Sequence, residues 1–244
     1  MPRHARILSP TGYYHVIMRG VNRQEIFFSD EDRIRFIDTI KRYKKQLGIE
    51  INAYCLMTNH VHILLKADDK LALFIKKLSS SYVYWFNHKY ERSGHLFQAR
   101  FSSEPIDTEG YMLTATRYIL HNPEKAGICK FTDYRWSSFS EFFKPDFCDL
   151  DILYHVSGNP IYLFDFLYSQ SNDKCADITN HHPTTDEEIA TIASHLSGVN
   201  DYTKISQLDT ITRNQILAKL KKNGGSVRQI SKITGINRGI VQRS

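Results

Sequence analysis

Two histidines with strand-like spacing could hold a metal ion. Residues 59–65 read NHVHILL, so His60 and His62 are separated by one residue. Side chains alternate between the two faces of a β-strand, which places both imidazoles on one face, about 6 to 7 Å apart along the strand. Two such imidazoles can ligate one divalent ion when a carboxylate or amide completes the set. The alternative is a pair of half-buried polar histidines that bind nothing.

A tyrosine and an asparagine one helical turn apart form a second candidate group. Residues 117–123 read RYILHNP, which puts Tyr118 and Asn122 at positions i and i+4 of a helix, on one face. A phenol with a pKa of about 10 is a poor nucleophile unless a metal ion polarises the electrophile. Asn122 could supply an oxygen ligand to the same ion. The alternative is a core or stacking tyrosine with an asparagine that caps the helix before Pro123.

The hydrophobic pattern predicts the elements that must position these groups. Segments rich in β-formers predict strands over 13–19, 49–57, 60–66 and 96–101. Apolar residues at helical spacing predict helices over 30–47, 71–90 and 108–121. The order β-α-β-β-α-β-α predicts an α+β domain with a ferredoxin-like split βαβ antiparallel sheet and an added helix.

Five motifs occur in order over roughly the first 140 residues. They are RGVNR from residue 19, NHVHILL from 59, GHLFQARF from 94, RYILHNPEKAG from 117 and YRWSS from 134. Together they resemble the bacterial single-tyrosine transposases of the HUH endonuclease class, and the nearest branch is the REP-associated tyrosine transposases. Five coincident motifs are far more specific than any one of them alone.

The resemblance implies an enzyme that cleaves and rejoins single-stranded DNA at hairpin or palindromic repeats. It implies His60 and His62 as ligands of a divalent metal ion, Mg²⁺ or Mn²⁺, and Tyr118 as the nucleophile that forms a 5′-phosphotyrosine. Asn122 matches the position at which the family places a third, polar ligand. Histidine ligands suit Mn²⁺ better than Mg²⁺.

Three other residues are candidates for the same roles of metal ligand or nucleophile. Relatives commonly read Leu-Asn-Pro-Val-Arg-Ala where this chain reads HNPEKA from residue 121, so His121 stands beside the proposed ligand and could compete for the metal. His15, on the first expected strand, is a further candidate ligand, ranked below Asn122. Tyr111 is the rival nucleophile, because it lies seven residues before Tyr118 and near the same helix face.

Basic and aromatic residues form the candidate DNA contacts. A loop after the first strand has an exposed backbone and two arginines that can clamp phosphates or read base edges. Phosphate or base contacts are expected from Arg19, Asn22, Arg23, Arg100 and Arg135. Tyr84, Trp85 and Tyr90 could stack unpaired bases, although core packing is favoured for Trp85. The alternative for the arginine loop is a solvated basic turn.

The charge is uneven along the chain and suggests three parts. The net charge is +6, with 22 Lys and Arg against 15 Asp and Glu in residues 1–145, 1 against 6 in 146–180 and 9 against 5 in 181–244. Two basic blocks suggest two surfaces that meet a polyanion. We expect a catalytic domain over 1–143, an acidic linker or packing segment over 144–182 and a helical domain over 183–244.

The C-terminal part contains a candidate helix-turn-helix. Residues 226–243 read SVRQISKITGINRGIVQR, with a glycine in the turn between two helix-sized segments. The second helix would present Asn237, Arg238, Gln242 and Arg243 to a DNA major groove. The alternative is a small helical bundle that packs on the catalytic domain.

Composition narrows the function classes further. Apolar residues make up 41% and aromatics 12%, which excludes a disordered or fibrous chain. We see no apolar run of the ~18 residues that a membrane helix needs and no secretory signal. The four cysteines form no CxxC pair, so we expect a cytoplasmic protein with free thiols.

The leading hypothesis is a DNA transposase. The alternatives are a non-catalytic DNA-binding regulator derived from one and a phosphodiesterase that uses water. The extra C-terminal part favours a monomer over a dimer.

Overall fold

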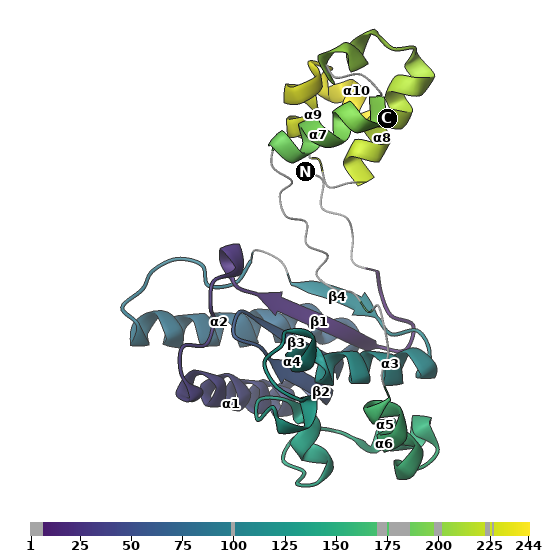
Figure 1. Cartoon of the computed structure of the whole chain (residues 1–244). Coiled ribbons are helices and arrows are strands. Elements are labelled where there is room, and N and C mark those ends of the chain that lie inside the picture. The colour runs from purple at the N-terminus through teal and green to yellow at the C-terminus, as the bar shows by residue number, and fades with distance from the viewer. Residues whose placement is uncertain are drawn as a thin grey trace. The chain divides into compact units, whose positions relative to one another are not determined.

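The chain folds as two units, each with its own core. The computed structural model describes residues 7–98, 101–169, 175, 186–197, 202–222, 225 and 227–244 (Figure 1). The first unit spans Met1–Asp177 and the second spans Ile178–Ser244. All described strands lie in the first unit, and none of the described helices is both long and apolar enough to cross a membrane.

Four antiparallel strands form the sheet of the first unit. They are β1 (Tyr13–Arg19), β2 (Glu50–Leu56), β3 (His60–Lys66) and β4 (Ser102–Pro105). The strand order is β2-β3-β1-β4, and each neighbouring pair runs antiparallel. Because β3 lies between β1 and β2, the first βαβ unit is split, and the predicted α+β fold is confirmed.

The fourth strand lies later in the sequence than predicted. The expected strand at 96–101 is wrong in its described residues: β4 begins at Ser102, and Phe97 makes an isolated bridge to Gly20, while residues 99 and 100 lie outside the described part. The apolar pattern reflects burial instead, because Leu96, Phe97 and Phe101 pack against the core beneath α1 and α2. The segment meets the end of β1 through the Gln98 amide, which donates to the Arg19 carbonyl oxygen at 2.8 Å. The polar segment 102–105 takes the place beside β1.

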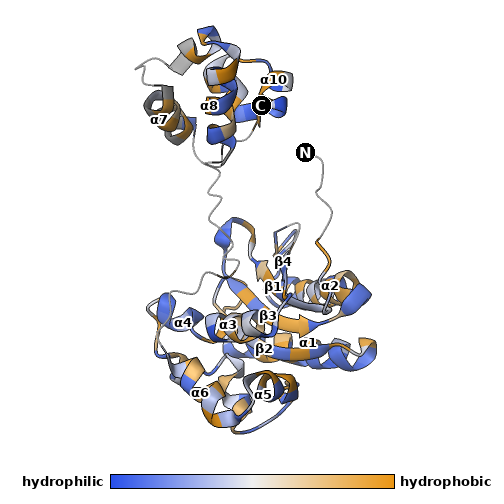
Figure 2. Cartoon of the chain, turned by 90° about the vertical axis from the view of Figure 1, so that its right-hand side faces the viewer, coloured by the Kyte–Doolittle hydropathy of each residue, from blue (hydrophilic) through white to orange (hydrophobic). Residues whose placement is uncertain are grey.

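Helices cover both faces of the sheet. Helices α1 (Asp30–Leu47) and α2 (Leu71–Lys89) pack against one face, and α3 (Glu109–Leu120) packs against the other (Figure 2). Alternation along the strands feeds two separate apolar clusters. Val61 and Ile63 of β3 face α1 and α2, whereas Leu64 faces α3.

The described part of the acidic segment expected over 144–182 packs on the first unit. Helices α5 (Asp151–Ser157) and α6 (Pro160–Tyr168) lie against α3, with Leu153, Leu163 and Leu167 fully buried. Helices α5 and α6 thus belong to the compact unit Met1–Asp177, while the domain limits at 143 and 183 stay predictions. Although the segment is acidic, α5 and α6 each have an apolar face that packs against α3.

Short elements complete the first unit. Helix α4 (Asn122–Lys125) follows α3 directly, and short 3-10 helices occur at Val21–Arg23, Asp68–Lys70, Phe131–Asp133 and Ser138–Phe142.

The second unit consists of helices in every part that is described. It contains α7 (Asp186–Ser197), a 3-10 helix (Tyr202–Gln207), α8 (Thr210–Lys222), α9 (Val227–Thr234) and α10 (Arg238–Arg243). Its buried residues include Ile189, Leu217, Leu220, Ile230 and Val241. Helices α9 and α10 occupy the positions expected for the helix-turn-helix, whose DNA-binding role stays a prediction.

Candidate active site

Two histidines and a tyrosine meet on the α3 face of the sheet. The ring centroids of His60 and His62 on β3 are 4.9 Å apart, and the ring of Tyr118 on α3 lies 5.9 Å from that of His62. The two histidines share a face because they alternate with Val61, which points into the opposite core. Tyr118 is only 2% exposed. Tertiary packing thus joins two motifs that lie more than fifty residues apart.

His60 is held in one tautomer by its neighbour. Its Nδ1 lies 2.6 Å from Oδ1 of Asn59, an oxygen that can only accept, so Nδ1 donates and Nε2 keeps its lone pair. Burial and the charge of Arg19 lower the pKa of His60 to about 4, and Asn122, which favours the protonated ring by hydrogen bonding, opposes this only in part. The imidazole is therefore neutral near pH 7, the form that binds metal ions.

His62 is paired with a third histidine. Its Nδ1 lies 2.9 Å from Nε2 of His15, which is fully buried on β1. Burial lowers the pKa of His62 well below its usual value, and the neighbouring His15, His60 and Arg19 lower it further. The Nδ1 atom of His15 has no hydrogen-bond partner among the described residues, although Oε2 of Glu104 lies 3.7 Å away.

Asn122 lies at the start of α4, next to His60. It is 8% exposed, and its amide Nδ2 donates to the carbonyl oxygen of Tyr118 at 2.9 Å. This bond turns the side chain back over the end of α3. Because the amide nitrogen is engaged, the carboxamide oxygen is the atom left to ligate an ion.

The donor set fits a divalent ion with open coordination positions. Two neutral imidazoles and an amide oxygen are brought together, whereas the described residues contain no group of three or more His, Cys, Asp or Glu side chains placed to hold a metal ion. Nitrogen ligands with one oxygen suit Mn²⁺ and related ions. Three protein ligands leave positions for a phosphate or water.

Positive charge surrounds the tyrosine. Nζ of the exposed Lys125 lies 3.8 Å from the centroid of the Tyr118 ring. Arg19 pairs with His60 across the β1–β3 ladder, so its charge lies at the same end of the sheet. An anionic group that approaches Tyr118 would therefore meet two cations.

The competing residues are engaged elsewhere. Tyr111 is hydrogen-bonded to Glu104, and burial together with that carboxylate raises the pKa of Tyr111. The ring of His121 stacks on Phe131 at 4.1 Å, its Nε2 lies 2.7 Å from the Leu167 carbonyl oxygen, and its Nδ1 lies 2.8 Å from Glu124. His121 therefore joins α4 to α6 instead of competing for an ion.

The expected DNA contacts of the first unit fall into different settings. Asn22 and Arg23 are exposed in the turn after β1, both with positive φ. Arg135 pairs with Asp30 at 3.1 Å and lies over the Trp136 ring. Arg100 lies outside the described residues.

Other candidates divide between structural and exposed roles. Tyr90 donates to Asp32, whereas Tyr84 is 77% exposed. In the second unit, Oδ1 of Asn237 accepts from the Gly239 amide and caps α10, so that oxygen is already in use. Arg238, Gln242 and Arg243 are exposed.

Sequence reasoning missed three residues of this site. Asn59 stood inside the quoted motif without a role, and Lys125 and Glu104 were not considered. Glu104 became visible only with the true β4, where it pairs with His15 across the ladder. His15 forms a hydrogen bond with His62, so its role in this site is next to a proposed metal ligand.

Comparisons with known proteins find a matching family and a similar fold. Residues 9–122 match a family described as "Transposase IS200 like". The solved structure of a REP-associated tyrosine transposase bound to a REP hairpin is 19% identical, with a TM-score of 0.53 over 72% of this chain and 96% of that chain. A candidate transposase from Deinococcus radiodurans R1 is also 19% identical, with a TM-score of 0.35 over 45% of this chain and 90% of that one. No curated protein matches the chain.

Proposed function

Because residues 9–122 belong to the IS200-like transposase family, we propose that the chain cleaves and rejoins single-stranded DNA through a 5′-phosphotyrosine on Tyr118. The observation that carries the proposal is the contact between the Tyr118 ring and His62 on one face of the sheet. A phenol beside two neutral imidazoles is the arrangement that metal-assisted nucleophilic attack requires.

His60, His62 and Asn122 would hold the divalent ion. When bound, the ion would offset negative charge on the scissile phosphate and orient that phosphate for attack. The protein contributes the neutral ligands, since burial keeps both imidazoles deprotonated. This step does not depend on a carboxylate ligand.

Tyr118 would form the covalent bond. Its phenolic oxygen bonds to phosphorus and loses its proton, while the bond from phosphorus to the 3′ oxygen breaks and that oxygen gains a proton. The resulting ester retains the energy needed to rejoin a strand, so attack by a 3′-hydroxyl reverses the step. Water does not need to enter the reaction.

Asn59 and His15 would act as positioning residues. Each lies against Nδ1 of one ligand histidine, at 2.6 and 2.9 Å. A partner at Nδ1 fixes the ring orientation and directs the Nε2 lone pair toward the ion. If His62 donates to His15, the Nδ1 proton of His15 points toward Glu104.

Access to Tyr118 requires a movement. The tyrosine is 2% exposed and the Lys125 ammonium lies over its ring, so DNA must displace this side chain or shift α3. The same ammonium could then contact the phosphate. Lys125 would thus cover the nucleophile before binding and neutralise charge afterwards.

The substrate would be a single strand with a hairpin or palindromic repeat. The solved relative was captured with a REP hairpin, which motivates the same substrate class for this chain. Exposed Asn22 and Arg23 would contact the strand near the site, with Arg19 beside them. The α9–α10 pair would add a second contact through Arg238, Gln242 and Arg243, and we propose that the chain acts as a monomer.

A denaturing gel tests the proposal. Wild-type protein and labelled hairpin DNA with Mn²⁺ should give a labelled protein band that resists denaturant. DNA binding without cleavage would instead favour a regulator derived from a transposase. Cleavage without a labelled protein band would favour a phosphodiesterase that uses water.

A further inference from the structure

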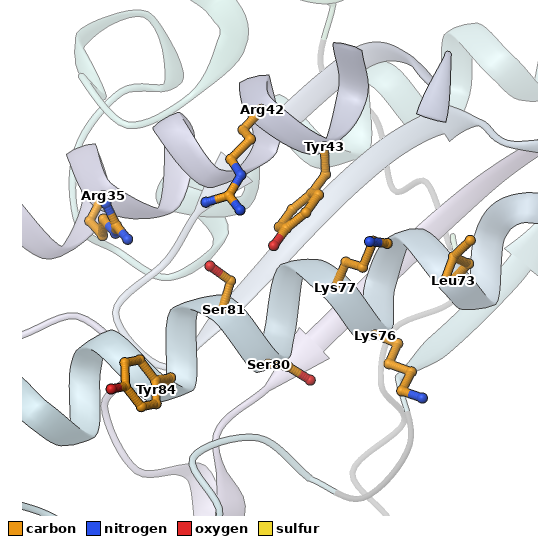
Figure 3. A pocket seen from close by; sticks show the side chains of 9 residues that line it. All are labelled: Arg35, Arg42, Tyr43, Leu73, Lys76, Lys77, Ser80, Ser81 and Tyr84. Atoms are coloured by element: carbon orange, nitrogen blue, oxygen red, sulfur yellow. The ribbon is translucent and has the colours of Figure 1, made fainter. Parts of the chain in front are cut away.

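A second basic surface lies between α1 and α2. It is a groove of about 650 Å³ whose walls include Arg35, Arg42, Tyr43, Lys76, Lys77 and Tyr84. Figure 3 shows Arg42 and Tyr43 extending from α1 toward α2, where Lys77 and Ser81 face them. At 1.5 Å per residue, the α2 wall from Lys76 to Tyr84 is about 12 Å long.

The four cations of this groove have no acidic partner within the described residues. Arg35, Arg42, Lys76 and Lys77 take part in no ion pair there, and no aspartate or glutamate lines the groove. Nε of Arg35 is buried without a hydrogen-bond partner. Four like charges along one groove repel one another, so an anion that binds there is favoured.

Apart from the exposed Lys45, the other Lys and Arg side chains on the same helices are paired with carboxylates. Arg33 pairs with Asp30, Lys41 with Asp146, Lys44 with Asp149, and Lys89 with both Glu31 and Asp32. The contrast shows that α1 and α2 do not merely carry a solvated basic surface. All the unpaired Lys and Arg side chains of α1 and α2 except Lys45 line the groove.

An aromatic ring stands at one end of the groove. Tyr84 is 77% exposed, although the neighbouring Tyr82 is fully buried. An exposed ring beside cations provides a stacking surface for an unpaired base, and such stacking tolerates any base sequence. The hydroxyls of Ser80 and Ser81 add donors for phosphate oxygens.

We propose that this groove binds the phosphodiester backbone of single-stranded DNA, with an unpaired base stacked on Tyr84. Helices α1 and α2 cover the sheet face opposite to the one that bears Tyr118, so the groove would hold a part of the strand remote from the cleaved phosphate. The choice of DNA rests on the proposed function. The single strand is favoured over a duplex because an exposed ring can stack only on an unpaired base.

The test is the affinity of the full chain for labelled oligo(dT), measured by fluorescence anisotropy over a salt series. Arg42→Glu with Lys77→Glu should weaken binding about tenfold and lower the salt slope by about 0.7 for each lost phosphate contact. The matched control is Lys45→Glu with Lys144→Glu, which makes the same charge change at two exposed lysines outside the groove. Equal losses in both variants would overturn the proposal.

Tyr84→Ala separates stacking from charge and spares the core, because the ring is exposed. It should weaken oligo(dT) binding about fivefold or more, whereas Tyr84→Phe should keep the wild-type affinity. Tighter binding of duplex DNA or of an acidic peptide than of oligo(dT) would overturn the single-strand assignment. Circular dichroism of each variant establishes that it is folded, and Tyr84→Ala carries the test if the double variant is not.

The two proposals fail in different ways. A labelled protein band from wild type together with groove variants that bind like the control would remove the groove proposal alone. Groove-dependent binding of oligo(dT) without any labelled protein band would support the groove and remove the tyrosine chemistry.

Discussion

The two faces of the sheet bury different kinds of side chains. Beneath α1 and α2, the strands contribute apolar residues such as Val16, Val61 and Ile63, all fully buried. Beneath α3, the same strands contribute His15 and His62, which are 0% and 2% exposed. Burying polar rings costs free energy that apolar packing would not. Both faces carry an apolar cluster, but only on the α3 face do the described strands also bury a pair of histidines in contact with each other.

Burial of a polar group is not by itself the mark of the site. Asp32, at the start of α1, is also fully buried, yet it accepts hydrogen bonds from the amides of Phe28 and Ser29, from Lys89 and from Tyr90. His15, in contrast, keeps one ring nitrogen without a partner in the part of the chain that is described. The complete set of partners explains the burial of Asp32 in structural terms, whereas the unsatisfied nitrogen of His15 needs another explanation, which its contact with His62 provides.

The largest effect is expected when the phenolic oxygen of Tyr118 is removed from the α3 face. Tyr118→Phe should abolish the DNA-linked protein band while DNA affinity stays near the wild-type value, because the ring and its packing persist. Tyr111→Phe, on the same helix, is the matched control and should keep the band. A labelled Tyr118→Phe band with none from Tyr111→Phe would show that the nucleophile has been misassigned.

Removal of the two ligand histidines should have the next largest effect. His60→Ala with His62→Ala should lose both metal-dependent cleavage and Mn²⁺ binding measured by calorimetry. The fold should persist, because neither ring belongs to the apolar clusters. His88→Ala, at an exposed position of α2, controls for a lost imidazole. Wild-type Mn²⁺ affinity in the double variant would contradict the metal assignment.

A large truncation on the opposite face should affect stability alone. Phe36 is fully buried against the sheet, so Phe36→Ala should lower the free energy of unfolding by about 3 to 5 kcal/mol. Ile34→Ala, at a position 47% exposed on the same helix, should cost far less. Urea unfolding gives the first quantity. Mn²⁺ affinity of the folded fraction should stay unchanged, and a parallel loss would show that the two faces are coupled.

The positioning role of His15 predicts an intermediate effect. His15→Gln should weaken Mn²⁺ binding about 10- to 100-fold, as loss of an outer partner of a ligand histidine does. Nitrogen NMR of the metal-free protein should show that the His62 ring is no longer held in a single tautomer. His155→Gln, at an exposed site, is the control. If the His62 tautomer is unchanged while Mn²⁺ binding weakens, the loss of affinity comes from altered packing around His15 and not from a lost hydrogen bond to His62.

The smallest effect concerns Asp32. Burial alone would raise the pKa of Asp32, but hydrogen bonds from Lys89, Phe28, Ser29 and Tyr90 hold it below its usual value. A lowered folded-state pKa stabilises the protein above the unfolded pKa of about 3.9, and this contribution is lost as the pH falls through the folded-state value.

Asp32→Asn should therefore cost about 2 kcal/mol near neutral pH, and the difference from wild type should shrink below about pH 4. Urea unfolding at several pH values measures this. A difference that stays constant down to low pH would mean that the charge of Asp32 does not contribute.

Much of the architecture followed from local pattern. Alternation placed His60 and His62 on one face, and helical spacing placed Tyr118 and Asn122 together, because both periods are properties of the backbone. The three strands and two long helices before residue 90 were predicted nearly to their ends. Ser29 and Gly48, which bound α1, carry local signals of helix start and stop.

Contacts between elements that are distant in the sequence could be seen only in the tertiary structure. The sequence could not show that His15 bonds to His62, since that contact joins residues 47 positions apart through strand pairing. It could not place β4, because the partner of an edge strand is chosen by the ladder and not by local propensity. Nor could composition reveal that α5 and α6 belong to the first unit: an acidic segment can still bury one apolar face, and only the surface of α3 shows that a partner for that face exists.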